Sequence, residues 1–473
     1  MSRSKKKSPK KSVAPKTSPA VSEEVPQEPP LCGSLIDKLF TTPRPRGRFD
    51  LGAFERQFKS EILSEGAKRL ETALNECVAK NPAPFVCSRC KRPLRNKGLK
   101  PKTLTTSLGE IVFRRRYGFC EGCKNGLFPD DEMFGLDPSS LSPEMQYIVS
   151  HFGADTDFSR SSDLLYKASL VRVPSKQVER TTERVGEDLR VYETQDTKPD
   201  IHPSPRGRIL YSSFDGTGCP ICARELLERL GKQLDGSART REVKIALFWE
   251  ANTYTFEGIP IRDLGSVSCT GAIESAASSG SEDSAFSQRV GREIKRRRAD
   301  EADQIVVIGD GAAWIWNTAH EHFPNAVCIL DRFHAKERLS NLSKAIHGDT
   351  EKAKAWRDEL YEDLDSGRTD ILLWKIMVYA KHFSQAKECH TYFSNNRHRM
   401  NYPEYRAKGY CTSSGVTEAA CKSVVGTRLK RSGMHWSVRG ANAITALRTY
   451  QMSGRFESFW ESRAERRALG MAA

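Results

Sequence analysis

The sequence lacks any run of about eighteen apolar residues, and its lysine-rich N-terminus has no apolar segment of the kind found in secretory signals. We therefore expect neither a membrane span nor export, and we expect an intracellular protein. A disulfide framework is also unexpected, because the 13 cysteines are spread over 473 residues and such frameworks belong to short secreted chains. Paired cysteines should bind metal, and the others should fill the core.

Negative charge is in deficit. Lysine and arginine number 75 against 60 aspartates and glutamates, which gives a formal net charge of +15 at pH 7. An excess of this size favours a polyanionic partner, either nucleic acid or an anionic membrane surface. The length is sufficient for roughly two to four domains with a sizeable core.

The N-terminal region is poor in apolar side chains. Residues 1–45 are rich in lysine, proline and serine, and they bury too little surface to offset the entropy lost on folding. We expect a disordered basic tail, whose lysine clusters either bind phosphates without sequence preference or are simply solvated. An amphipathic pattern over residues 46–80 then predicts an N-terminal helical segment.

Two Cys-x-x-Cys pairs stand in residues 81–135, on either side of a hairpin-like stretch. Four thiolates that arrive in pairs from two tight turns suit tetrahedral zinc, so this region is predicted to be a zinc ribbon with one Zn(II). A site with four sulfur ligands has no open coordination position, and the zinc is therefore expected to be structural. The four predicted ligands are Cys87, Cys90, Cys120 and Cys123.

Three consecutive arginines, Arg114, Arg115 and Arg116, lie on the second strand of the predicted hairpin. A basic strand can contact the backbone of DNA, and it can equally be a solvated surface. The sequence leaves both interpretations open.

Residues 140–195 have helical periodicity with a break at Leu170–Pro174. A second helix capped by Ser175 would give the form of a helix-turn-helix DNA-binding domain. A helical hairpin that only fills a core is the competing interpretation. The side chains near the start of the second helix, where a recognition helix meets base edges, are Lys176, Gln177 and Arg180.

Two predicted strands end in an aspartate followed by a glycine. The first is Arg208–Phe214, followed by Asp215, and the second is the β-branched run Ile305–Ile308, followed closely by Asp310. Open α/β sheets place their ligands at the carboxyl ends of strands, so the two aspartates are candidates for one paired-carboxylate site. Asp310 could equally cap a helix that starts near Ala312.

Further strands are predicted at Arg241–Glu250, Tyr254–Phe256 and Ala326–Leu330, with helices between the later ones. The resulting order, β-β-β-α-β-α-β-α, is typical of a ribonuclease H-like α/β domain, here residues 206–347 and 409–462. A third Cys-x-x-Cys, at Cys219 and Cys222, has no second pair nearby in the sequence, and we favour an unliganded pair.

Residues 348–408 are charged and helical in pattern and contain no strand candidate, so we expect an α-helical insertion. Near its end, three arginines are interleaved with Tyr402 and Tyr405. A basic and aromatic patch of this kind suits phosphates and unstacked bases, and a solvated loop is the alternative. The three arginines are Arg397, Arg399 and Arg406.

A set of short strings recurs in order over roughly residues 85–460: Phe214-Asp-Gly-Thr217, Thr240-Arg-Glu-Val-Lys244, Gly309-Asp-Gly-Ala312, Leu330-Asp-Arg-Phe-His-Ala335, Arg399-Met-Asn-Tyr402, Ser413 through Lys422, and Gly433-Met-His-Trp436. Together with the cysteine pairs, these strings resemble the insertion-sequence transposases of the ISKra group, a bacterial family with a DDE catalytic core. The family usually has Gly-Ser-Gly before its glutamate, where this chain has Ser413-Ser-Gly.

The resemblance implies that Asp215, Asp310 and Glu418 form the catalytic triad. On the sequence alone, Glu418 would be an ordinary helix acid paired with Lys422 one turn later. Three close carboxylates repel one another and stay ionised only with cations between them, so a pair of Mg(II) or Mn(II) ions is expected in each active site. The implied reaction is DNA cleavage followed by strand transfer.

Asp331 and His334 resemble an acid-x-x-His motif of Mutator-type relatives, which implies accessory roles. His334 could equally be a packing histidine. Basic side chains on the helix that carries Glu418 would neutralise DNA phosphates, and these are Lys422, Arg428, Lys430 and Arg431.

The expected partners are double-stranded DNA with terminal inverted repeats, target DNA and further copies of the chain, which would form a homodimer or higher oligomer on DNA. No membrane partner is expected. The location that follows from the resemblance is the bacterial cytoplasm, in association with the nucleoid. Two alternatives stay open, a ribonuclease H-like nuclease that cuts without joining and a non-catalytic DNA-binding regulator.

Overall fold

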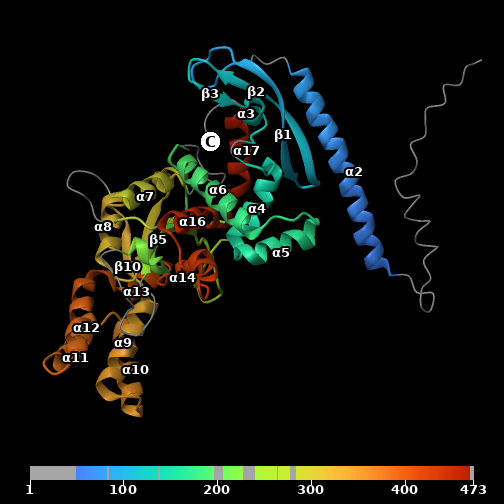
Figure 1. Cartoon of the computed structure of the whole chain (residues 1–473). Helices are drawn as coiled ribbons and strands as arrows, with labels where there is room; N and C mark the ends of the chain where they lie inside the picture. Colours follow the sequence, from blue (N-terminus) through green and yellow to red (C-terminus); the bar gives the residue numbers. More distant parts are fainter. Residues whose placement is uncertain are drawn as a thin grey trace, which may run out of the picture. The chain divides into compact units, whose positions relative to one another are not determined.

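The computed structural model describes residues 50–81, 85–136, 139–195, 206–226, 240–263, 265–276 and 284–468 (Figure 1). The predicted basic tail lies outside these ranges. The chain divides into two compact units, Met1–Gly66 and Ala67–Ala473. The described part of the first unit is the first half of helix α2 (Leu51–Lys80), where Phe54 stacks on Phe58 at 5.9 Å between ring centroids.

Residues 85–136 contain an antiparallel sheet in the order β1-β2-β3. Leu104, Ile111 and Phe113 are buried against the second half of α2, which therefore covers one face of the β1–β2 hairpin. Asn75 of α2 also accepts a hydrogen bond from Arg114 N at 2.8 Å, at a position where β2 has no third strand beside it. The elements are β1 (Arg95–Thr106), β2 (Gly109–Cys120), β3 (Asn125–Leu127) and α3 (Pro129–Met133).

Three helices follow, each begun by a local signal in the sequence. The hydroxyl of Ser142 accepts a hydrogen bond from Met145 N, and the carboxylate of Asp157 accepts one from Arg160 N. Leu170 ends the second helix in a left-handed conformation. Ser175 is the first residue of the third helix, so the prediction that it precedes this helix as a cap is wrong. The helices are α4 (Pro143–Asp155), α5 (Phe158–Ser169) and α6 (Ser175–Gln195).

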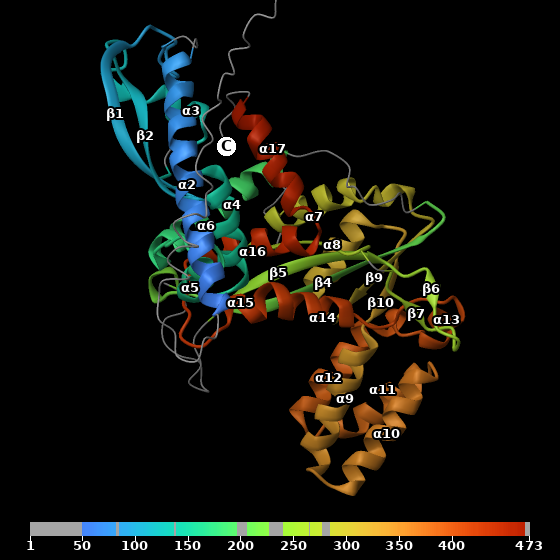
Figure 2. The ribbon, with the colours of Figure 1, turned by 90° about the vertical axis from the view of Figure 1, so that its right-hand side faces the viewer.

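The largest sheet has five strands in the order β10-β9-β4-β5-β8. β4 runs parallel to β9 and β9 to β10, whereas β5 is antiparallel to both β4 and β8. In Figure 2, α7 and α8 lie on one side of this sheet and α14 (Gly415–Cys421) on the other. The elements are β4 (Ile209–Pro220), β5 (Thr240–Glu250), β8 (Ser268–Ala272), α7 (Ala285–Arg296), β9 (Gln304–Gly309), α8 (Ala313–His322), β10 (Val327–Leu330) and α9 (Arg332–His347).

Two strand predictions need correction. The strand expected at Tyr254–Phe256 is not in the main sheet, because Thr253–Tyr254 (β6) pairs only with Pro260–Ile261 (β7) in a small hairpin. The third strand of the main sheet is β8 instead. β4 also continues past Asp215 to Pro220, because the antiparallel partner β5 pairs with it along its whole length.

Residues 351–407 form a group of helices joined by short turns, and this group comes after α9 in the chain. Their helices pack on one another and on α9 (Figure 2). The elements are α10 (Glu351–Asp365), α11 (Thr369–Ala380), α12 (Ser384–Asn395) and α13 (Tyr402–Ala407). The chain then continues through α14, α15 (Thr427–Leu429), α16 (Val438–Met452) and α17 (Phe456–Ala468).

Helix α6 is packed into the same body as the main sheet. Gly186 lies so close to α16 that a Cβ atom there would sit 2.3 Å from the carbonyl oxygen of Ala443. Farther along α6, the buried carboxylate of Glu193 pairs with Arg289 of α7 and accepts a 2.8 Å hydrogen bond from Thr270 of β8. The chain is thus a mixed α/β protein in which buried contacts pack the three-helix segment against elements of the main sheet region.

Candidate functional site

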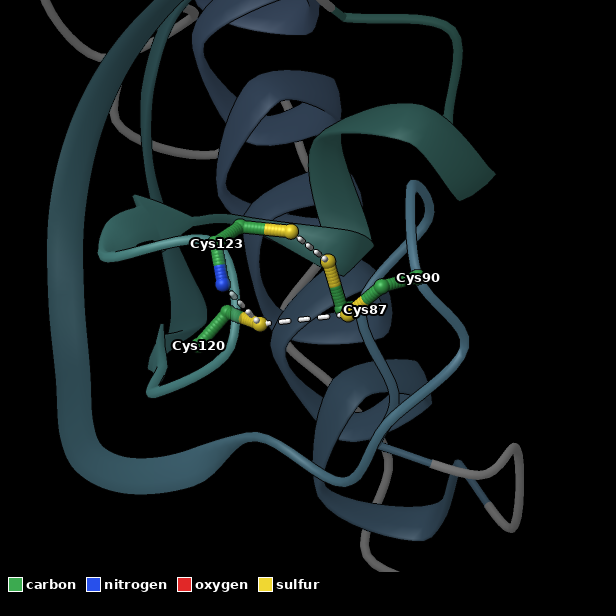
Figure 3. Close-up of side chains that lie close together, drawn as sticks. All are labelled: Cys87, Cys90, Cys120 and Cys123. Carbon is green, nitrogen blue, oxygen red and sulfur yellow. Dashed lines mark hydrogen bonds between the residues drawn. The ribbon is translucent and has the colours of Figure 1, made fainter.

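The four predicted zinc ligands come together. The sulfur atoms of Cys87, Cys90, Cys120 and Cys123 all lie within 4.8 Å of one another (Figure 3). In the described part of the chain, this is the only group of three or more cysteine, histidine or acidic side chains close enough to hold a metal ion. Four thiolates at this spacing fit tetrahedral zinc, and the cluster could hold one zinc ion.

Each cysteine pair is formed by a tight turn. In the first, Cys87 N donates to Arg92 O at 2.8 Å and Lys91 N donates to Cys87 O at 2.9 Å. The residues that follow the two pairs, Lys91 and Lys124, have positive φ angles of 60° and 52°. This conformation is unfavourable for a side chain with a Cβ, and the tertiary contacts of the cluster hold it in place.

Asp215 and Asp310 stand on adjoining parallel strands. Asp215 lies two residues beyond Ser213, where the β4–β9 pairing ends, and Asp310 directly follows β9. The pKa of Asp215 is raised, mainly because the carboxyl is buried, and the charge of Asp310 raises it further. Hydrogen bonds from the thiol of Cys421 and the amide of Gly216 act in the opposite direction. Counted on from the Ser213–Ile308 pair, Asp215 and Asp310 come at the same level of the two chains. Asp310 does not act as a helix N-cap, since α8 starts at Ala313 after Ala312.

Asp331 connects β10 to the segment before α14. One carboxylate oxygen accepts from Phe333 N at 2.6 Å and His334 N at 3.1 Å, and the other accepts from Ser414 N at 2.6 Å and from the Ser414 hydroxyl. His334 Nδ1 is 3.5 Å from Asp331 Oδ2. The nearby carboxylate of Asp331, together with the charges of Asp310 and Asp215, raises the pKa of His334 to about 9. A positive charge therefore adjoins the aspartates at neutral pH.

Glu418 lies on α14, which packs against β4 and β5. Cys421, one turn later on the same helix, contacts the carboxylate of Asp215. Residues three apart on a helix are neighbours on one face, so the backbone at Glu418 is close to this site. The Glu418 side chain itself forms a 2.7 Å ion pair with Lys422, and both side chains are exposed.

Tyr392 is part of this site and was not predicted. Its hydroxyl donates a 2.7 Å hydrogen bond to the carbonyl oxygen of Asp310, and the guanidinium of Arg338 lies 4.0 Å from the centre of its ring. A Cβ atom on Gly311, whose φ is +99°, would sit 2.5 Å from the same ring. Glycine is therefore required at this turn for conformation and for space. Tyr392 has no sequence signal, because it is one of two adjacent aromatic residues in α12 and nothing in the sequence sets it apart from Phe393.

The predicted DNA-binding residues of β2 are mostly engaged within their own sheet region. Arg116 forms a 2.6 Å ion pair with Asp130, and Arg115 pairs with Asp131. Both acids are buried residues of α3, so these two arginines neutralise them. Arg114 is exposed.

The residues predicted to meet base edges lie on the first turns of α6. Lys176 is exposed and forms a 2.7 Å ion pair with Glu179. The amide of Gln177 donates to the Ser140 hydroxyl at 2.8 Å, and Arg180 is exposed. The start of α6 is thus accessible, whereas its later turns are packed on α16.

The basic and aromatic patch near the end of the insertion does not form. Tyr402 and Tyr405 are buried, and the Tyr402 hydroxyl donates to Leu330 O at 2.9 Å, so neither ring is available to a base. The arginines have separate partners. Arg397 pairs with Asp370 at 2.6 Å, Arg399 lies over the Trp316 ring at 4.4 Å, and Arg406 donates to Asp365 O at 2.6 Å.

Arg428 is fully buried, so the expectation that it contacts a phosphate does not fit the structure. Its guanidinium lies against the rings of both Phe158 and Trp436, 4.6 and 4.9 Å from their centres, and donates to Gly153 O. Two other predicted phosphate contacts are exposed, Lys430 beside Thr217 and Arg431 at 3.1 Å from Asp157.

Cys219 is buried and Cys222 is half-buried. Neither belongs to a metal-compatible cluster within the ranges that the structure describes.

No helix in the described ranges has both the length and the apolar character needed to cross a bilayer.

Residues 292–464 match the uncharacterised protein family UPF0236, a match that spans less than half of the chain. Among solved structures, the chain is similar to the Drosophila P element transposase strand transfer complex, with 8% sequence identity and a TM-score of 0.24. That similarity covers 71% of this chain and 84% of the other. No match was found among curated proteins.

Proposed function

We propose that this protein is a DDE-type DNA transposase whose ribonuclease H-like domain cleaves DNA and joins its ends to a target. The observation that carries the proposal is the juxtaposition of Asp215 and Asp310 on adjoining parallel strands, beneath the helix that bears Glu418. The strand directions of the main sheet and the sequence resemblance support the same interpretation.

The carboxylate donors are of the type that divalent magnesium prefers, but Asp215, Asp310 and Glu418 do not lie within metal-sharing distance of one another in this structure, so Glu418 must move toward the two aspartates to share an ion with them. Carboxylate oxygens are the hard ligands that Mg(II) prefers, and the pKa of Asp215, which burial and Asp310 raise, would fall beside a cation. Asp215, Asp310 and Glu418 would hold the ions, which when bound activate the attacking oxygen and stabilise the leaving oxygen of a phosphodiester. For Glu418 to bind an ion, its carboxylate must leave the ion pair with Lys422 and contact the cation instead.

The chain's own groups prepare this site. Asp215 and Asp310 each use Oδ1 to accept a backbone N–H, from Gly216 at 2.7 Å and Ala312 at 2.9 Å. These bonds fix the orientation of both carboxylates. The positive charge of His334 offsets part of their mutual repulsion, which favours the ionised forms that bind metal.

Incubation of the protein with Mg(II) and the DNA ends that flank its gene tests the proposal. Joined products support a transposase, nicks without joining indicate a nuclease, and bound but intact DNA indicates a regulator. Asp215→Asn and Asp310→Asn should each reduce joining by about two orders of magnitude or more. Asp300→Asn, at an exposed acid outside the site, is the matched control and should retain wild-type activity.

A further inference from the structure

The β6–β7 hairpin presents a solvent-exposed aromatic ring on a rigid support. Thr255 N donates to Ile259 O at 2.8 Å and Gly258 N donates to Thr255 O at 2.9 Å, which closes a three-residue loop. Gly258 has the positive φ, 77°, that such a loop requires. At the loop's first position, Phe256 is 106% exposed.

The base of the hairpin is held in place as well. The carboxylate of Asp263 accepts hydrogen bonds from the Asn252 side chain at 3.1 Å and from the Thr253 hydroxyl at 3.1 Å. The ring of Tyr254 lies against Gly409, where an added Cβ would be 3.1 Å from it. The exposure of Phe256 is therefore built into an ordered element.

A cavity of about 550 Å³ lies beside the hairpin, between its loop and the segment before α14. Arg262, Arg332 and Arg406 line it, together with a single carboxylate, that of Glu257. Arg332 and Arg406 both contact Asp365, whereas Arg262 is exposed and has no ion pair in the described part of the chain.

This cavity lies beside Asp331. Arg332 directly follows Asp331, and the main-chain N–H of Arg332 donates a hydrogen bond to Thr412 O at 2.9 Å. Ser413, which lines the cavity, precedes the Ser414 that binds Asp331.

We propose that the β6–β7 hairpin binds an unpaired nucleotide of DNA, with the base stacked on the exposed ring of Phe256 and its phosphate on Arg262, which lines the neighbouring cavity. An unpaired nucleotide combines a flat apolar base with a phosphate, and the hairpin offers an exposed ring, Phe256, together with the exposed Arg262. Tyr254, Ile259 and Ile261 are exposed on the same hairpin, and a protein partner is therefore the competing occupant that the test below distinguishes. The inference rests on the proposed function for its choice of DNA.

Binding of a single-stranded oligonucleotide that contains 2-aminopurine, measured on the full chain without added magnesium, tests this inference. Phe256→Ala should weaken binding by about 5- to 150-fold and abolish the quenching of 2-aminopurine, because stacking is lost. Phe256→Tyr should restore both. Arg262→Ala should lower the dependence of affinity on salt by about 0.7 in slope. Trp374→Ala, at a 61% exposed aromatic of α11, is the matched control and should bind as wild type.

Equal binding and equal quenching for Phe256→Ala and wild type would overturn the inference. It would also be overturned if sedimentation showed that Phe256→Ala, but not Trp374→Ala, dissociates an oligomer while oligonucleotide binding is unchanged, since the hairpin would then join copies of the chain. The proposed function is tested separately. If joining depends on magnesium but oligonucleotide binding does not depend on Phe256, the proposed function stands and the inference about the hairpin fails. If binding depends on Phe256 but no joining occurs with magnesium, the inference stands and the proposed function fails.

Discussion

The hydroxyl of Tyr392 donates a 2.7 Å hydrogen bond to the main-chain carbonyl oxygen of Asp310, across 82 residues of sequence. Tyr392 belongs to α12, and Asp310 directly follows β9. The helices after α9 therefore reach the turn that carries one of the two central aspartates. We expect them to position that turn.

Tyr392→Phe should raise the magnesium concentration needed for half-maximal DNA cleavage by about 2- to 10-fold, since a hydrogen bond of this kind contributes about 0.5–1.5 kcal/mol. A magnesium titration of the cleavage rate measures the shift. Tyr361→Phe is the control, because it removes the equivalent bond to Lys336 O at 3.0 Å, which is not at Asp310. Equal titrations for the two variants would contradict the positioning role.

Gly186→Ala should destabilise the fold by about 1–3 kcal/mol, because the new methyl group would meet the carbonyl oxygen of Ala443 at 2.3 Å. Gly291→Ala, also within a helix, meets nothing closer than His322 Cε1 at 3.4 Å. It should be neutral or stabilise by up to about 1 kcal/mol. Urea unfolding of both variants gives the comparison, and a neutral Gly186→Ala would contradict the close packing of α6 on α16.

Cys90→Ser should abolish zinc binding, because three remaining thiolates leave the tetrahedral site incomplete. Purified wild-type protein should contain about one zinc ion per chain by elemental analysis, and the variant close to none. Cys222→Ser, in the other Cys-x-x-Cys pair, should retain the zinc. Loss of zinc in both variants, or its absence from wild type, would refute the assignment.

Glu293 should make the fold sensitive to acid. Burial opposes its ionisation, but Arg455, at 2.7 Å, outweighs burial and lowers the pKa of Glu293 from 4.5 to about 2. A lowered folded-state pKa means that this stabilisation is fully present above pH 4.5 and is lost as the pH falls toward 2.

Glu293→Gln should cost about 3–5 kcal/mol at neutral pH, where it breaks a buried ion pair, and less as the pH falls through this window. Unfolding free energies of wild type and variant across the window measure the difference. For Glu359→Gln, at an exposed acid, the difference in unfolding free energy from wild type should not shrink as the pH falls. A difference between wild type and Glu293→Gln that stays constant with pH would argue against the ion pair.

Local patterns in the sequence predicted the features that depend on local chemistry. The spacing of the cysteine pairs predicted the four-sulfur cluster, and the β-branched run before Asp310 predicted β9. β8 escaped prediction because Ser268–Ala272 has small residues and no β-branched run, and because it becomes a strand only through pairing with β5. The length of β4 beyond Asp215 has the same non-local origin, since β5 determines it.

Charge was the least predictable property. The sequence gives no sign that Arg115 and Arg116 pair with buried aspartates of α3, or that Arg428 packs against two aromatic rings. A side chain's partner is a property of the fold, so a count of basic residues overstates the positive surface available to DNA. Tyr402 and Tyr405 illustrate the same point for aromatic residues, because both entered the core.

The buried contacts that fix α6 to α7, β8 and α16 hold the exposed start of α6 in a set position relative to the main sheet. For an enzyme that recognises DNA with α6, the number of base pairs from the recognised sequence to the broken bond would be constant. Substrates in which that interval is lengthened or shortened by half a helical turn would present the wrong side of the duplex and escape cleavage.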